Sequence, residues 1–164
     1  LGDLKAIEVP KGSYCREALT SDLYGGERLF GETPHVFVSQ TVLLSEESCQ
    51  DAIEAAELWA KQNGGWISSR HFNVPTSDVP MRFLAELLPW FRKVLAEVLL
   101  PAAAAAYPAA VANASGLRVF EAFLVRYRAG AQAGLQLHCD QSLISYTIAL
   151  NHPSEYEGGG TWFR

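Results

Sequence analysis

Two side chains near the end of the sequence, His138 and Asp140, could hold a metal ion. They stand two residues apart in the segment LQLHCD, and residues i and i+2 of an extended strand point to the same face. An imidazole beside a carboxylate can form two arms of a 2-His-1-carboxylate site, which leaves open positions on a non-haem Fe(II) ion. Cys139 then points to the other face, so a zinc site made of all three neighbours does not fit.

A His-x-Asp triplet alone is weak evidence, because a hydrogen-bonded surface pair is its ordinary explanation. Its surroundings are more specific. Tyr127 and Gly130 precede it in VRYRAG, Leu150-Asn151 ends the next β-rich run, and YEGGGTWF follows. This ordered set resembles the 2-oxoglutarate- and Fe(II)-dependent dioxygenases, specifically the prolyl-4-hydroxylase-like group. The detailed resemblance covers residues 119–163.

The resemblance implies a fold, a chemistry and a set of site residues. The fold would be a double-stranded β-helix, or jelly roll, buttressed by helices. His138 and Asp140 would be Fe(II) ligands and Tyr127 would line the 2-oxoglutarate pocket. Thr147 is a second co-substrate candidate, because Ala149 stands where such enzymes often have a Tyr. The activity would be hydroxylation of a peptidyl substrate, prolyl-type or related, with Fe(II), 2-oxoglutarate and, as a further candidate, ascorbate as cofactors.

One part of the family's site has no counterpart in this sequence. The second iron-binding His and the basic residue that pairs with 2-oxoglutarate lie several strands after the Gly-Gly motif, and Arg164 is the last residue given. His152 is too close to Asp140 to be that His, and His35 and His71 precede the barrel. We therefore expect the polypeptide to continue past Arg164, or a neighbouring subunit to cover the open half of the barrel.

Two functions remain open at this point. The chain is an enzyme if the unseen part supplies the second His and the basic residue. Its partners would then be a small-molecule co-substrate and a peptide or protein substrate. Alternatively it is a catalytically inactive accessory or scaffold subunit with the same fold, held among neighbouring subunits in a larger assembly, since a fold does not determine a function.

Two helical regions are expected to support the site. A helix over residues 46–62 is predicted by the N-cap candidate Ser45 and by the Asn-Gly-Gly that follows residue 62. A second helical region is predicted from about residue 78 to 107. Pro89 should break it and open a second helix, because proline is tolerated in the first turn but not in a helix interior.

The remaining segments are assigned by composition. LRVFEAFLVRY and LISYTIALN are rich in β-branched and aromatic residues, which favours strands. Helices that precede strands indicate an α+β fold rather than a βαβ repeat. The Gly-, Pro- and charge-rich residues 1–34 are interpreted as an extension or arm. Residues 35–164 would form a partial dioxygenase-like domain, with its helices within 46–107 and its strands within 117–164.

Composition narrows the partners and the compartment. The net charge of −5 and the scattered basic residues give no reason to expect nucleic acid, whose phosphates need clustered Lys and Arg. The uncharged run 98–117 is interpreted as an Ala-rich helix and turn rather than a transmembrane segment. Cys15, Cys49 and Cys139 contain no CxxC spacing, so free thiols are expected, in a reducing compartment or an organelle interior rather than in a secreted protein.

Overall fold

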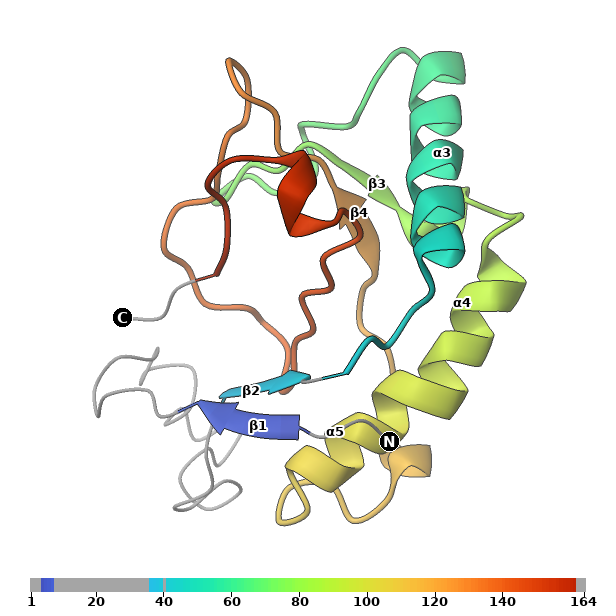
Figure 1. Cartoon of the computed structure of the whole chain (residues 1–164), viewed down its shortest axis with the longest axis vertical. Helices are drawn as coiled ribbons and strands as arrows, with labels where there is room; N and C mark the ends of the chain where they lie inside the picture. Colours follow the sequence, from blue (N-terminus) through green and yellow to red (C-terminus); the bar gives the residue numbers. More distant parts are fainter. Residues whose placement is uncertain (1–3, 8–35, 40, 162–164) are drawn as a thin grey trace.

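The computed structural model describes residues 4–7, 36–39 and 41–161. Within these ranges the chain combines α-helices with two small antiparallel sheets (Figure 1). The strands and α-helices are, in chain order, β1 (Leu4–Ile7), β2 (Val36–Ser39), α3 (Glu46–Gln62), β3 (Asp78–Pro80), α4 (Leu88–Val94), α5 (Leu100–Ala106) and β4 (Phe123–Val125).

The first predicted helix is confirmed as α3. The Ser45 side chain accepts a hydrogen bond from the Ser48 backbone N–H at 3.2 Å, which caps the N-terminus. After the last turn, Gly64 adopts a φ of +82°, a conformation that costs glycine little. One face of α3 is buried and carries small side chains at helical spacing: Cys49, Ala52, Ala56 and Ala60.

The second predicted helical region differs at its start. Residues 78–80 form strand β3 instead of a helix, and β3 pairs with β4 in the register Asp78↔Val125 and Pro80↔Phe123. That pairing partner lies far along the chain, where local periodicity cannot reveal it. The predicted role of Pro89 is confirmed, because α4 begins at Leu88 with this proline in its first turn.

A π-helical turn, Leu95–Leu99, joins α4 to α5. Pro101 lies in the first turn of α5 and has no N–H with which to continue an α-helical ladder. The hydroxyl of Tyr146 donates to the carbonyl of Leu99 at 2.5 Å, so the segment after β4 is attached to the end of this π turn. Single π turns of this kind are often found at functional sites.

The hydrophobic core lies between α3, the β3–β4 ribbon and the segment that leads into α4. Its buried members are Ala52, Ala56, Val79, Met81, Leu84, Leu87 and Leu124. Trp59 of α3 stacks on Phe83 with ring centroids 5.3 Å apart and closes the core at one edge. This packing fixes β4, and with it the position at which the chain enters the predicted site.

The C-terminal segment differs most from expectation. Residues 126–161 are all described, and no β-strand forms within them; Pro153–Glu155 make a 3₁₀ turn. The strand predicted over 143–150 is therefore absent from the structure, because a strand needs a hydrogen-bonded neighbour and none lies beside this segment among the described residues. In Figure 1 this segment lies on the side of β4 that faces away from α3. The structure shows mixed helices and small antiparallel sheets; it does not show a jelly roll.

Part of the predicted arm is ordered into a sheet. Residues Leu4–Ile7 form β1, which pairs antiparallel with β2, and the rest of residues 1–34 lies outside the described ranges. Phe37 of β2 meets Tyr107, just after α5, edge to face at 5.2 Å. Among the residues described, none of the helices has the length and apolar character needed to cross a bilayer.

The cysteines differ from the expectation of free thiols. Cys49 is free and buried, as predicted. Cys139 is disulfide-bonded, so the prediction is wrong for this residue. The prediction for Cys15 lies outside the described residues. Three scattered cysteines without a recognisable spacing gave no signal of this bond in the sequence.

Candidate functional site

The structure brings His138 and Asp140 together. The Nε2 atom of His138 lies 3.4 Å from Oδ1 of Asp140, and the two side chains are 33% and 51% exposed. The other ring nitrogen, Nδ1, lies 2.8 Å from the backbone carbonyl of Gln136. The pair is therefore both accessible to an ion from solvent and held on one side by the backbone.

The hydrogen bond to Gln136 has a chemical consequence for the pair. A carbonyl oxygen can only accept, so Nδ1 of His138 must carry the proton in this contact. In the neutral imidazole Nε2 is then left with its lone pair, which faces a carboxylate oxygen that also has only lone pairs to offer. At 3.4 Å, a cation placed between them would satisfy both atoms, and in the imidazolium form the Nε2–H would itself pair with Asp140. A carbonyl bound to the far nitrogen is also how metal-binding histidines are commonly oriented.

The separation suits two ligands of one ion. Ligand atoms that each lie about 2.1 Å from a metal, at angles between a right angle and a tetrahedral one, are about 3.0–3.4 Å apart. Across the described part of the chain, no group of three or more His, Cys, Asp and Glu side chains is placed to hold a metal. The 3.4 Å separation is compatible with His138 and Asp140 as two ligands of one ion, and their role in metal binding stays a prediction.

Tyr127 and Thr147 are the two predicted co-substrate residues. Tyr127 lies two residues after the end of β4 and is 52% exposed, and partial burial raises the pKa of its phenol. Thr147 is exposed on the extended segment between Tyr146 and Leu150. No hydrogen bond or ion pair among the described residues joins either side chain to His138 or Asp140. Their predicted role in co-substrate binding stays a prediction.

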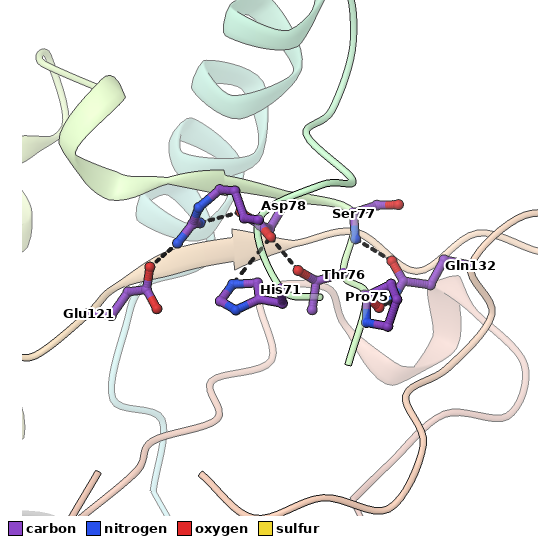
Figure 2. Close-up of polar contacts among 8 residues, drawn as sticks. His71, Pro75, Thr76, Ser77, Asp78, Glu121 and Gln132 are labelled. Atoms are coloured by element: carbon purple, nitrogen blue, oxygen red, sulfur yellow. Dashed lines mark hydrogen bonds and ion pairs between the residues drawn. The ribbon is translucent and has the colours of Figure 1, made fainter. Parts of the chain in front are cut away.

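A buried polar cluster supports the strand that leads to the site, and sequence reasoning missed it. Its centre is Asp78, whose side chain has no exposed surface. The carboxylate pairs with Arg70 through one oxygen and accepts a hydrogen bond from Thr76 through the other (Figure 2). Arg70 also pairs with Glu121, immediately upstream of β4. The cluster thus links residues 70–78 to the start of β4.

The same cluster contains a histidine. Nε2 of His71 lies 3.6 Å from Oδ2 of Asp78 and has no hydrogen-bond partner, while its ring lies against Phe123 at 5.1 Å. Arg70 also lies over the Phe123 ring, at 5.3 Å. His71 therefore lies in the cluster with one buried ring nitrogen that makes no hydrogen bond, and the expectation that it is not the second iron-binding His stays a prediction.

A second contact group fixes the end of β4. Nη1 of Arg126 donates to both carboxylate oxygens of Glu57 on α3, at 3.0 and 3.1 Å. The Arg126 guanidinium lies 4.7 Å from the centre of the Trp66 ring, whose Nε1 also donates to Glu57 at 3.2 Å. Tyr127 is the next residue, so its backbone leaves from a strand end that is attached to α3.

The sequence is similar to known proteins along most of its length. Over 160 residues, 93% of the chain, the sequence is 32% identical to procollagen-lysine,2-oxoglutarate 5-dioxygenase 1 of Mus musculus and 33% identical to that of Homo sapiens. Over 127 residues it is 31% identical to the multifunctional procollagen lysine hydroxylase and glycosyltransferase LH3 of Rattus norvegicus. No family model and no solved structure matches the chain.

These homologues define a class of protein first: they are 2-oxoglutarate-dependent dioxygenases. More particularly, they are named for procollagen lysine, so the prolyl-hydroxylase-like group of the sequence resemblance is not confirmed. The matched stretches are 21% and 17% of the lengths of these relatives, so the chain spans about a fifth of each.

Proposed function

We propose that this chain contributes to a 2-oxoglutarate- and Fe(II)-dependent dioxygenase that hydroxylates a peptidyl lysine. The proposal rests on one observation above all. The His-x-Asp pair, in a chain similar over 93% of its length to procollagen-lysine 2-oxoglutarate 5-dioxygenases, presents two lone-pair donors 3.4 Å apart. His138 and Asp140 would hold Fe(II), and the remaining ligands would come from outside the described residues.

The chain's own residues would bind and orient the reactants. Like any phenol, Tyr127 is protonated at neutral pH, and burial raises its pKa further, so it can donate a hydrogen bond to a carboxylate of 2-oxoglutarate. Thr147 can donate through its hydroxyl in the same way. Fe(II) and 2-oxoglutarate, when bound, supply the oxidative chemistry: dioxygen places one oxygen atom in a substrate C–H bond and the other in succinate, with release of CO₂.

Lysine replaces proline as the proposed substrate residue. The sequence resemblance implied a prolyl-type substrate, whereas the homologues are named for lysine in procollagen. The residues described here contain no contact that selects one over the other, so the choice rests on the homologues alone. The site's exposure is consistent with a peptide that approaches from solvent.

Turnover of 2-oxoglutarate tests the proposal. The native full-length protein would be supplied with Fe(II), 2-oxoglutarate and collagen-like peptides that contain lysine, or proline without lysine, and succinate would be measured with the peptide mass. We expect succinate and a peptide one oxygen atom heavier with the lysine peptide only. The matched variants are Asp140→Ala, which should abolish both products, and Asp51→Asn, an exposed aspartate on α3, which should not.

Each contrary outcome has a separate meaning. Hydroxylation of the proline peptide alone would restore the prolyl substrate and overturn the lysyl one. Succinate formation that Asp140→Ala leaves unchanged would remove the metal role of this residue. A protein that folds but turns over no 2-oxoglutarate with either peptide would favour the accessory or scaffold function.

A further inference from the structure

The chain between β4 and the His138–Asp140 pair begins with a compact turn. The N–H of Arg128 donates to the carbonyl of Gln132 at 2.8 Å, and the N–H of Ala131 donates back to Arg128 at 3.1 Å. Gly130 has a φ of +76°, which permits the reversal of the chain. Tyr127 enters this turn, and the segment that leads to His138 leaves it at Gln132.

The side chain of Gln132 fastens the turn to a second segment. Its Nε2 donates to the carbonyl of Pro75 at 2.7 Å, and its Oε1 accepts from the N–H of Ser77. Figure 2 shows Gln132 facing Pro75 and Ser77. One carboxamide thereby uses its donor and its acceptor on backbone groups, in the manner of an added strand residue. The contact continues the β3–β4 ladder, since the Arg126 N–H already donates to the Ser77 carbonyl at 2.8 Å.

The segment 75–77, to which Gln132 is hydrogen-bonded, is itself attached to a buried ion pair. Thr76 bonds the fully buried carboxylate of Asp78, which is paired with Arg70. A carboxylate buried in this way resists displacement, because its charge would otherwise lose a partner in a low-dielectric environment. Gln132 therefore connects the exit of the turn to one of the best-packed parts of the chain, 55 residues away in sequence.

We propose that Gln132 is a positioning residue for the metal-binding arm, residues 133–140. This inference rests on the proposed function. With both hydrogen bonds in place, the arm starts from a fixed point and direction, so less conformational entropy is lost when His138 and Asp140 take up the ion. Without them, the start of the arm is held only by the turn and its far end by the disulfide at Cys139, so the ion must supply more of the ordering of the two ligands.

Two substitutions at Gln132 separate hydrogen bonding from packing. Gln132→Met keeps the length of the side chain but can make neither bond, and Gln132→Ala removes the side chain beyond Cβ. The matched control is Gln136→Ala. Gln136 is the same residue type, exposed and closer to His138, and it contacts that histidine only through its carbonyl, which alanine retains.

The first measurement is the affinity of the full-length protein for Fe(II), under anaerobic conditions with 2-oxoglutarate present. Because the ion must then order more of the arm, we expect Gln132→Met and Gln132→Ala to weaken Fe(II) binding on the order of tenfold. Gln136→Ala should bind as the wild type does. A role in general stability alone would lower the denaturation midpoint without changing the dissociation constant for Fe(II).

The second measurement needs no metal. Amide hydrogen exchange of the apo protein should accelerate at Ser77, whose N–H loses its acceptor, and across residues 127–140 in both Gln132 variants. Exchange within α3 should stay as in the wild type. Unchanged exchange at residues 127–140 would show that Gln132 does not hold the arm and would overturn the inference.

The outcomes distinguish this inference from the function on which it rests. If the wild type binds Fe(II), Asp140→Ala does not, and Gln132→Met binds like the wild type, the positioning role is wrong and the proposed function stands. If Asp140→Ala binds Fe(II) as well as the wild type does, the proposed metal site is wrong and the positioning role falls with it.

Discussion

The buried carboxylate of Asp78 is paired with the guanidinium of Arg70, eight residues earlier in the chain, and this pair connects the segment before β3 to the core. Asp78→Ala would leave Arg70, which is 14% exposed, without its buried partner. Removing one member of a buried pair costs about 3–5 kcal/mol, so the free energy of unfolding should fall by that amount. Chemical denaturation measures it.

Glu121→Ala is the control for this prediction. Glu121 is the second partner of Arg70 and its side chain is 27% exposed, so solvent screens the pair. We expect a loss of about 1 kcal/mol or less, because Arg70 keeps Asp78. Equal losses for the two variants would show that the cluster is not organised around Asp78.

The partly buried phenol of Tyr146 should make the free energy of unfolding depend on pH under alkaline conditions. Burial, and to a smaller extent Tyr107, raises the pKa of Tyr146 to about 12, while a backbone hydrogen bond at Ala103 acts in the opposite direction. The folded state thus holds this proton more tightly than an unfolded chain, where a phenol titrates near about pH 10. The contribution to stability is complete below that pH and is lost as the pH rises toward 12.

The test compares wild type and Tyr146→Phe by chemical denaturation at a series of alkaline pH values. The variant should lose stability less steeply with pH than the wild type in this window. At neutral pH the free energy of unfolding of the variant should also be lower by about 1 kcal/mol, the usual contribution of a hydrogen bond such as that to Leu99. Identical slopes would mean that Tyr146 titrates alike in the folded and unfolded states.

The thiol of Cys49 should react slowly with alkylating reagents in the native protein. Burial, and in addition the charge of Glu46, raises the pKa of Cys49, which lies on the buried face of α3. The thiolate is the reactive form, so alkylation of the native protein should be slower than that of the denatured protein by on the order of tenfold or more. Peptide mass spectrometry can follow Cys49 individually.

Glu46→Gln provides a graded check on the Cys49 prediction. Removing that charge should accelerate alkylation slightly, while burial still keeps it well below the denatured rate. Alkylation of native Cys49 at the denatured rate would show that α3 does not pack as described.

Local signals predicted what local interactions determine. The N-cap Ser45 and the glycines after Asn63 mark both ends of α3, and Pro89 marks the start of α4. Strand β3 was missed because Asp78–Pro80 pairs with residues more than forty positions later. The run 143–150 has the composition of a strand but, among the described residues, no neighbouring strand to pair with.

The candidate site was predictable to a similar extent. His138 and Asp140 were found because they are two residues apart and carry ligand chemistry. Gln132 was not, because its contacts lie 55 and 57 residues away and a glutamine in a polar loop has no local signature. The proposed metal ligands follow from a motif, whereas the proposed positioning residue depends on long-range packing.

The central claim is that His138 and Asp140 bind Fe(II). Its most direct test is a calorimetric titration of the native full-length protein with Fe(II) under anaerobic conditions. His138 and Asp140 should be ligands, so Asp140→Ala and His138→Ala should each abolish binding at the high-affinity site, while Asp51→Asn binds as the wild type does. Adding 2-oxoglutarate should tighten Fe(II) binding in the wild type and not in the two ligand variants. Fe(II) binding of equal affinity and stoichiometry in Asp140→Ala and in the wild type would contradict the account.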